Sequence, residues 1–241
     1  MTDDIDLVLM RRFDAAQRFW GRFWLHSHVH LQRLRAFWMV SAAEFGKRTL
    51  DIAVSLLVLL LLSPLFALIA AVVWVEDGGS VFFAQTRVGR YGRHFKMYKV
   101  RSMCCDAEQR LKEVLARNQH AQGVTFKLKA DPRITRVGKW LRKFSLDELP
   151  QFYNVLTGDM SLVGPRPPVP REVAKYSLAD RRRLAIKPGI TCVWQISGRS
   201  EIDFSGQVKL DVAYIENQSF WSDLKILALT LPAVLSGKGA C

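Results

Sequence analysis

The 241-residue sequence has few cysteines and no arrangement of them that favours a metal. Its four cysteines form no Cys-x-x-Cys pair, so we expect no zinc site. The adjacent Cys104 and Cys105 are poorly placed for an unstrained disulfide, which predicts reduced thiols in a cytosol-facing protein. His26, His28 and His30 would not share one face of a helix and have no acidic neighbour, so we expect no metal there.

Acidic residues are also scarce, which narrows the range of partners. The chain has 22 acidic against 35 basic residues, a net charge of +13, and residues 86–148 alone carry +10. Such a balance favours an anionic partner: a nucleic acid, an anionic membrane surface or a phosphorylated substrate. No internal repeat or low-complexity linker is visible, and the length suits one sizeable core with attachments.

Charge is absent from residues 52–75, an apolar run of 24 residues. As a helix it would measure about 36 Å, enough to cross a hydrocarbon core of about 30 Å. Pro64 at its midpoint predicts a kink, and the Ser63 hydroxyl could bond the carbonyl that the proline leaves free. Since basic residues flank both ends, we expect a re-entrant helix that returns to the same face, with a straight span as the alternative.

Two further segments have an interfacial character. Residues 11–38 mix arginine with phenylalanine and tryptophan, which suits a helix lying at lipid headgroups or one packed on a partner. Residues 220–235 are apolar around most of a helix but too short and proline-interrupted to span, so they form either core or a surface-lying helix.

The remaining pattern predicts a mainly helical α/β fold built around a membrane anchor. Two strands, at 81–83 and 94–100, should flank a glycine-rich turn. Helices are expected at 106–119 and 134–144, in a stretch that stops at Pro188-Gly189, and again over the last third. We therefore predict a monotopic membrane protein in three parts: an interfacial extension at 1–45, a re-entrant helix at 46–76 and a cytosolic catalytic domain at 77–241 with an interfacial C-terminal helix.

The stretch "SLDELPQF" places Asp147 and Glu148 side by side within the basic region. Ser145 followed by Glu148 three residues later matches a helix capping box, which is a purely structural explanation. A chemical role is compatible with it, because a helix N-terminus stabilises an aspartate anion and keeps it available as a nucleophile or metal ligand.

Nearby residues favour chemistry. The rigid loop 164–167 fixes the guanidinium of Arg166, a group suited to bidentate phosphate binding. Lys99, Arg101 and Arg87 add further cations upstream. Paired carboxylates beside several cations indicate Mg²⁺ and a diphosphate substrate, although a surface salt-bridge network would use the same residues.

Four motifs, in order, carry a family resemblance: "KRTLDIAVSLLVLLLLSPLF", "YKVRSM", "SLDELPQFYNVLTGDMSLVGPRP" and "KPGITCVWQISGR". From about residue 46 onward the sequence resembles the bacterial sugar transferases, small monotopic phosphoglycosyl transferases. The resemblance implies a re-entrant helix broken at Ser63-Pro64 in the bacterial inner membrane. It implies transfer of a sugar-1-phosphate from a UDP-sugar to undecaprenyl phosphate, with release of UMP. Asp147 would be the nucleophile and form a covalent phosphosugar intermediate. Glu148 would also be catalytic, as a Mg²⁺ ligand with Asp147 and a base towards the lipid phosphate, and Arg166 would bind phosphate.

The last third is similar to family members that start exopolysaccharide or O-antigen chains with glucose or galactose. Cys192 departs from that pattern, since such enzymes commonly carry glycine there. A homo-oligomer is compatible with the sequence, which leaves the sugar open.

Two other functions stay open at this point. A membrane-anchored nucleic-acid-binding protein would explain the charge but not the adjacent carboxylates, and we expect no nucleic-acid partner. A catalytically silent scaffold would tolerate loss of Asp147. Arg101 could instead pair with Asp147 or Asp159, and Lys99 could be a solvated strand residue.

Overall fold

The computed structural model describes residues 44–107, 109–110, 131–198 and 202–236. The chain divides into two units, Met1–Lys47 and Arg48–Cys241, and the second contains nearly all of the described residues. The predicted interfacial extension lies almost wholly outside the described residues. So do the three histidines and most of the helix expected at 106–119.

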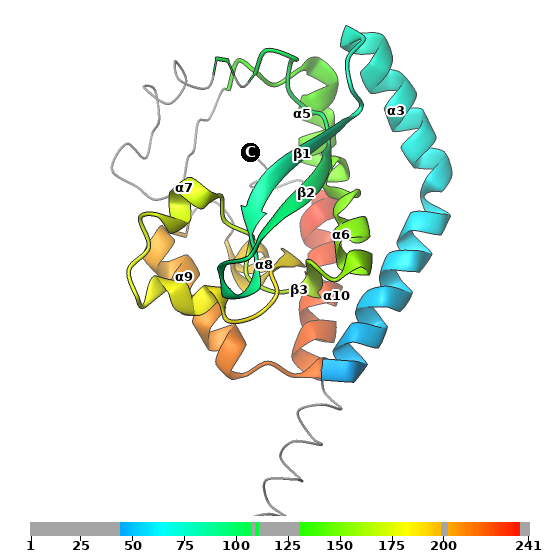
Figure 1. Cartoon of the computed structure of the whole chain (residues 1–241). Coiled ribbons are helices and arrows are strands. Elements are labelled where there is room, and N and C mark those ends of the chain that lie inside the picture. The colour runs from blue at the N-terminus through cyan, green and yellow to red at the C-terminus, as the bar shows by residue number, and fades with distance from the viewer. Residues whose placement is uncertain (1–43, 108, 111–130, 199–201, 237–241) are drawn as a thin grey trace, which may run out of the picture. The chain divides into compact units, whose positions relative to one another are not determined.

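The second unit is mixed α/β and mostly helical, as predicted (Figure 1). After a first helix, Glu44–Leu61, the elements follow in this order: α3 (Ser63–Asp77), β1 (Phe82–Val88), η1 (Arg90–Gly92), β2 (His94–Val100), α5 (Arg136–Lys143), η2 (Leu146–Glu148), α6 (Gln151–Thr157), β3 (Ser161–Val163), α7 (Pro170–Val173), η3 (Asp180–Leu184), β4 (Gly189–Thr191), α8 (Val193–Ser197), α9 (Phe204–Glu216) and α10 (Phe220–Ser236).

The apolar run forms two helices with a sharp bend. Within the described residues no single helix has the length and composition to cross a bilayer, but Glu44–Leu61 and α3, bent by 59°, pass that test together. Pro64 cannot donate to the carbonyl of Leu60, and the Ser63 hydroxyl donates to that carbonyl instead, at 2.9 Å. The predicted kink and its compensating bond are both confirmed.

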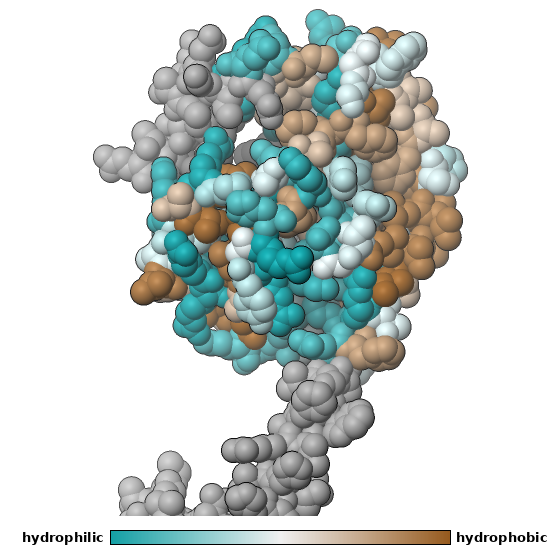
Figure 2. All heavy atoms as spheres, in the orientation of Figure 1, coloured by the Kyte–Doolittle hydropathy of each residue, from teal (hydrophilic) through white to brown (hydrophobic). Residues whose placement is uncertain are grey.

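The bent pair buries one side and exposes the other. Leu50 and Val54 pack against a core that contains Met97 and Val155. The opposite side shows a band of apolar residues (Figure 2) that includes Leu56, Leu57, Leu60, Leu61, Leu68, Val72, Trp74 and Val75. An apolar face that the protein leaves uncovered is typical of an interaction site for membrane or partner.

A second, smaller core forms where α3 meets α5. Ile69 and Val73 from α3 pack with Val100 and Leu141. The bent pair therefore contacts the domain along both of its halves.

The predicted hairpin is confirmed, with a longer first strand than expected. β1 and β2 pair antiparallel from Phe82↔Val100 to Val88↔His94, and the turn between them includes Tyr91 at φ 56°. Directly paired residues point to the same face of a hairpin. Lys99, paired with Phe83, and Arg87, paired with Phe95, therefore lie on one face.

A short parallel pair, β3 with β4, was not predicted. Its strands pair Ser161 with Gly189 and Val163 with Thr191. The backbones approach so closely that a Cβ on Gly189 would lie 2.1 Å from the nitrogen of Gly164. Only glycine fits here, and the contact fixes the start of the loop 164–167.

The C-terminal third is helical, as expected, with one exception. The stretch before Pro188 forms only the 3₁₀ helix η3. Helix α10 contributes Ile226 to the main core while Trp221 and Leu231 are exposed, and its interfacial role stays a prediction.

Candidate active site

The segment that carries the carboxylates is a tight turn and not the start of a capped helix. Helix α5 ends at Lys143, and Ser145 then adopts a left-handed backbone conformation at φ 54°. The Ser145 side chain makes no capping bond, so the predicted capping box is wrong. A positive φ is uncommon for serine, and such strained positions cluster at functional sites.

The two carboxylates lie beside Lys99 of β2. Its ammonium is 2.7 Å from Glu148 Oε1 and 3.7 Å from Asp147 Oδ2. Asp147 is only 6 % exposed, whereas the Glu148 side chain is 30 % exposed. Lys99 is therefore a partner of the carboxylates and not a solvated strand residue.

The environments of the two carboxyl groups push their pKa values in opposite directions. Burial raises the pKa of Asp147, helped by the charge of Glu148, and Lys99 only partly offsets this. Burial also acts to raise the pKa of Glu148, but Lys99, Arg166 and Arg87 outweigh it and the pKa is lowered. Adjacent groups with diverging pKa values are typical of acid–base and nucleophilic sites.

Arg87 links the hairpin to the proline-rich loop. Its Nη1 donates to the Pro167 carbonyl at 2.9 Å, and its Nη2 donates to Gln85 at 2.6 Å. Burial, together with the charge of Arg166, lowers the Arg87 pKa to about 10. The buried Nε has no hydrogen-bond partner among the described residues. Arg87 thus brings a desolvated positive charge to the same loop that carries Arg166.

Arg166 itself is exposed at the tip of that loop. It lies close enough to Glu148 to lower the pKa of that carboxyl. Two backbone bonds hold the loop, from Gly164 N to Thr191 O at 3.0 Å and from Gly189 N to Pro165 O at 2.9 Å. The guanidinium can therefore meet an anion from solvent while its backbone stays fixed.

Arg142 is a site residue that sequence reasoning missed. Its Nε donates to Ser102 Oγ at 2.9 Å, and its charge acts to lower the pKa of Asp147. Burial lowers the pKa of Arg142 itself. The one sequence signal for Arg142 is its position in the last turn of the helix that precedes Asp147. A basic residue there is also expected at any helix C-terminus, so the signal does not indicate a site.

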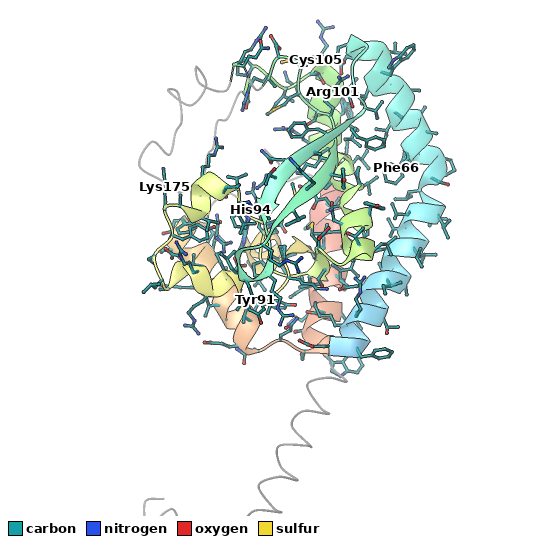
Figure 3. The ribbon with its side chains drawn as sticks, in the orientation of Figure 1. Phe66, Tyr91, His94, Arg101, Cys105 and Lys175 are labelled. Atoms are coloured by element: carbon teal, nitrogen blue, oxygen red, sulfur yellow. The ribbon has the colours of Figure 1, made fainter. Side chains whose placement is uncertain are left out.

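The side chain of Arg101 contacts Asp77 and Cys105 and not the carboxylates of this cluster. It pairs with Asp77 at the C-terminal end of α3, and its Nη1 lies 3.3 Å from the Cys105 sulfur (Figure 3). Its partner is thus neither of the acids considered for it. Asp159 instead accepts from the Thr157 hydroxyl at 3.0 Å, within its own turn. A phosphate-binding role for Arg101 stays a prediction.

A surface hollow of about 650 Å³ lies away from the carboxylates. Val88 and His94 line it from the hairpin face opposite to Lys99, and Arg181 lines it from η3. Its lining is mainly apolar and includes none of the predicted catalytic residues.

The described residues contain no cluster of three or more His, Cys, Asp or Glu side chains that could hold a metal. Asp147 and Glu148 offer two adjacent carboxylates beside a half-open site. Mg²⁺ commonly takes one or two protein carboxylates and completes its shell with water and substrate phosphates. The donor set therefore fits a Mg²⁺ ion that arrives with a phosphorylated substrate.

The three cysteines that the structure describes, Cys104, Cys105 and Cys192, are free thiols, as predicted. Cys192 is buried, which raises the pKa of its thiol well above the usual range, and it donates to Gln195 Oε1 at 3.2 Å. The neutral thiol thus helps to order the start of α8.

Comparison with known proteins identifies the class. The model of the family described as bacterial sugar transferase matches residues 42–237. The chain belongs to this family, as its motifs indicated.

Individual relatives are similar over most of this chain. It is 55 % identical over 196 residues to "Galactosyl transferase CpsE" of Streptococcus agalactiae, covering 81 % of this chain and 43 % of the relative. It is 44 % identical over 220 residues to "Undecaprenyl-phosphate galactose phosphotransferase" of Salmonella typhimurium, covering 90 % and 46 %.

Against "Exopolysaccharide production protein ExoY" of Rhizobium meliloti the identity is 44 % over 198 residues, with 81 % of this chain and 88 % of the relative covered. The chain thus spans less than half of the first two relatives but nearly the whole of the third.

Proposed function

We propose that this protein is a phosphoglycosyl transferase. It would move a sugar-1-phosphate, glucose or galactose, from a UDP-sugar to undecaprenyl phosphate and release UMP, as the first membrane step of exopolysaccharide or O-antigen assembly. The observation that carries the proposal is the buried Asp147 beside Lys99, in a site ringed by Arg87, Arg142 and Arg166. The names of the relatives from Salmonella typhimurium and from Komagataeibacter xylinus, which is 39 % identical over 205 residues, support the galactose and glucose alternatives.

In the first step, an Asp147 oxygen attacks the β-phosphorus of the UDP-sugar. The bond from that phosphorus to the bridging oxygen breaks, UMP leaves with the oxygen, and an acyl phosphate joins Asp147 to the sugar phosphate. Burial raises the pKa of Asp147, which indicates a desolvated, reactive carboxylate, while the charges of Lys99 and Arg142 favour its ionised form.

In the second step, a phosphate oxygen of undecaprenyl phosphate attacks the same phosphorus. The acyl–oxygen bond to phosphorus breaks, Asp147 is regenerated, and the product carries a new diphosphate bond. Glu148, with its lowered pKa, stays ionised at neutral pH and is suited to hold a metal or accept a proton.

Arg166 and Arg87 would bind the phosphate oxygens. Arg166 is exposed for a bidentate contact, and the buried Arg87 adds positive charge where water cannot screen it. Mg²⁺ bound by Asp147 and Glu148 would supply further charge neutralisation for the diphosphate.

The bent helix pair would serve as a re-entrant anchor in the bacterial inner membrane, with the catalytic domain on the cytoplasmic side. The exposed leucines on the outer side of the bend suit hydrocarbon. An acceptor phosphate could then react at the headgroup level without leaving the interface.

UMP release tests this function. Wild type and Asp147→Asn, in lipid nanodiscs, receive Mg²⁺, undecaprenyl phosphate and a panel of UDP-sugars. Sugar-dependent UMP from wild type alone supports the proposal and identifies the donor. Equal release from the variant would remove Asp147 from the chemistry, and no release with any donor would favour a scaffold.

A further inference from the structure

The base of the membrane helix bonds directly to the catalytic domain through Arg48 and Asp51, which lie about one turn apart. Arg48 Nη1 donates to the Val155 carbonyl at 2.5 Å, and Nη2 donates to Leu156 at 2.7 Å. These carbonyls belong to the C-terminal half of α6, where helix carbonyls lack partners within the helix. The guanidinium bonds two of them, the Val155 carbonyl also accepting from the Gly158 backbone at 3.1 Å, and its charge complements the helix dipole.

Asp51 forms hydrogen bonds to a second element of the domain, strand β3. Its Oδ1 accepts from the Leu162 backbone at 2.9 Å and from the Ser161 hydroxyl at 3.1 Å. Its side chain is among the buried charges of the domain. A buried carboxylate is expensive unless its bonds are kept, so this contact specifies one arrangement of helix and strand.

Helix α6 and strand β3 each adjoin, along the chain, one of the two segments that form the active site. Helix α6 starts at Gln151, three residues after Glu148. Strand β3 ends at Val163 and leads directly into the loop of Arg166. One turn of the membrane helix therefore holds both the segment that follows the carboxylates and the segment that precedes the phosphate-binding loop.

The other end of the bent pair is held in the same manner. Glu76 Oε1 accepts from the backbone of Val137 at 3.1 Å, at the start of α5, and Asp77 pairs with Arg101. Helix α5 leads into the turn of Asp147. The catalytic turn thus lies between α5, held from the end of the bent pair, and α6, held from its beginning.

Polar contacts occupy the two ends, and exposed apolar residues occupy the bend. Leu56 and Leu57 become exposed little more than one turn after Asp51, and Trp74 and Val75 are exposed up to the residue before Glu76. The polar contacts hold the two ends of the pair on the domain, Leu50, Val54, Ile69 and Val73 pack against it between them, and the apolar residues on the other side stay uncovered.

We propose that Arg48 and Asp51 are positioning residues that fix the height and orientation of Asp147 relative to the bilayer. Through them the phosphate of a bilayer-embedded acceptor reaches the phosphosugar on Asp147. This inference rests on the proposed function. Arg48 and Asp51 are thereby assigned to the second step, transfer to the lipid acceptor. The UDP-sugar is soluble and can reach Asp147 at any distance of the site from the bilayer.

Three assays on each variant test the inference. The first is exchange of labelled UMP into UDP-sugar, which needs no acceptor. The second is transfer to a short-chain prenyl phosphate in detergent, and the third is transfer to undecaprenyl phosphate in nanodiscs. The variants are Arg48→Met and Asp51→Ala, with Asp51→Asn and Arg48→Lys as conservative controls.

We expect Arg48→Met and Asp51→Ala to keep exchange and short-chain transfer within about threefold of wild type. Transfer in nanodiscs should fall by about 10- to 100-fold, since a misplacement of about 1 Å can cost on the order of 100-fold. Asp51→Asn keeps an acceptor oxygen for Leu162 and Ser161 and should restore transfer. Arg48→Lys keeps the charge and should restore it in part.

Parallel losses in all three assays, or no loss in nanodiscs, would overturn the inference. If Asp51→Ala does not fold, Arg48→Met decides, because Arg48 is only partly buried and its replacement leaves no buried charge. A wild type that catalyses neither exchange nor transfer would refute the proposed function, and the inference with it. Wild-type activity with parallel variant losses refutes the inference alone.

Discussion

Asp147 and Glu148 are neighbours in the chain, yet their ionised forms contribute to stability with opposite signs. The pKa of Asp147 is raised in the folded protein by burial, so ionising it at neutral pH favours unfolding. The pKa of Glu148 is lowered because Lys99 and the arginines outweigh burial, so its ionisation favours folding. Asp147, the proposed nucleophile, thus stays in a place where its ionised form destabilises the fold.

The first prediction is that Asp147→Asn raises the melting temperature near neutral pH while it abolishes UMP release. The gain should shrink as pH falls through the raised pKa, since protonated Asp147 no longer opposes folding. Each kcal/mol gained corresponds to about 2–4 °C in a chain of this size.

Thermal unfolding followed from about pH 8 to about pH 4 measures this effect. Glu148→Gln is the matched control and should lower the melting temperature near neutral pH. A destabilised Asp147→Asn would contradict the role of burial.

The second prediction concerns Lys99→Met. Loss of the ammonium removes a charge that lowers the pKa of both carboxyl groups. The acid limb of the pH–rate profile for UMP release should therefore move to higher pH, and the rate at neutral pH should fall about 10- to 100-fold.

Lys96→Met is the control on the opposite hairpin face, where the Lys96 ammonium donates to the Thr86 hydroxyl. It should leave the profile unchanged. Equal shifts in both variants would mean that overall charge, and not contact with the carboxylates, sets the profile.

Sequence reasoning selected most of this site because charge and residue type are readable without coordinates. Asp147, Glu148 and Lys99 come together as the motif indicated. It failed where backbone conformation decides: the left-handed Ser145 cannot be read from "SLDE". It also missed Arg142, since a basic residue at a helix end has an ordinary explanation.

At the scale of elements, glycine positions show which contacts cannot move. Gly138 lies in α5, and a Cβ there would come within 2.0 Å of the Ser102 carbonyl oxygen. Ser102 also receives the hydrogen bond from Arg142. The close approach of α5 to this segment therefore sets the position of a site residue.

The third prediction compares two helical glycines. Gly138→Ala should destabilise the protein by about 1–3 kcal/mol through overpacking, even though alanine is the better helix former. Activity should also fall, because Ser102 must shift and Arg142 with it.

Gly46→Ala is the control, since nothing lies within 4 Å of a Cβ there. It should stabilise by about 0.5–1 kcal/mol. Chemical unfolding of both variants tests the pair, and equal effects would contradict the steric argument.

The fourth prediction concerns the bend between helix Glu44–Leu61 and α3. Ser63→Ala should cost about 1 kcal/mol in wild type because the Leu60 carbonyl loses the hydroxyl that donates to it. In a Pro64→Ala background a backbone N–H can bond that carbonyl, and the cost should largely disappear. A double-mutant cycle by thermal unfolding measures this coupling, and additive effects would exclude it.

Elements with local signals were predicted, and those with distant partners were not. The hairpin and α9 follow from periodicity and turn residues. Strands β3 and β4 have three residues each and are strands only through their pairing with each other. No local sequence pattern indicates this pairing. The strand pair that supports the loop of Arg166 could therefore not be predicted.

At the scale of the whole molecule, the net charge of +13 and the exposed apolar bend favour a membrane surface as the main partner. A nucleic-acid binder would need the same charge but not the uncovered leucines of the bend. Homo-oligomerisation and the placement of residues 1–45 stay predictions.

The fifth prediction is that both ends of the bent pair lie on the cytoplasmic side. Cys105 is exposed and lies beside Asp77 at the C-terminal end of α3, and Gly46→Cys would mark the other end. Neither thiol should react with a membrane-impermeant maleimide in intact cells, and both should react after lysis. Labelling of one end alone in intact cells would indicate a straight span.

The hydroxyl of Ser63 also has a practical consequence for handling the protein. It bonds the carbonyl freed by Pro64 inside the chain, so that carbonyl needs no hydrogen-bond donor from outside the protein. The same angle should therefore persist in micelles of different thickness. If it does, detergents can be selected for gentleness, without matching their chain length to a bilayer.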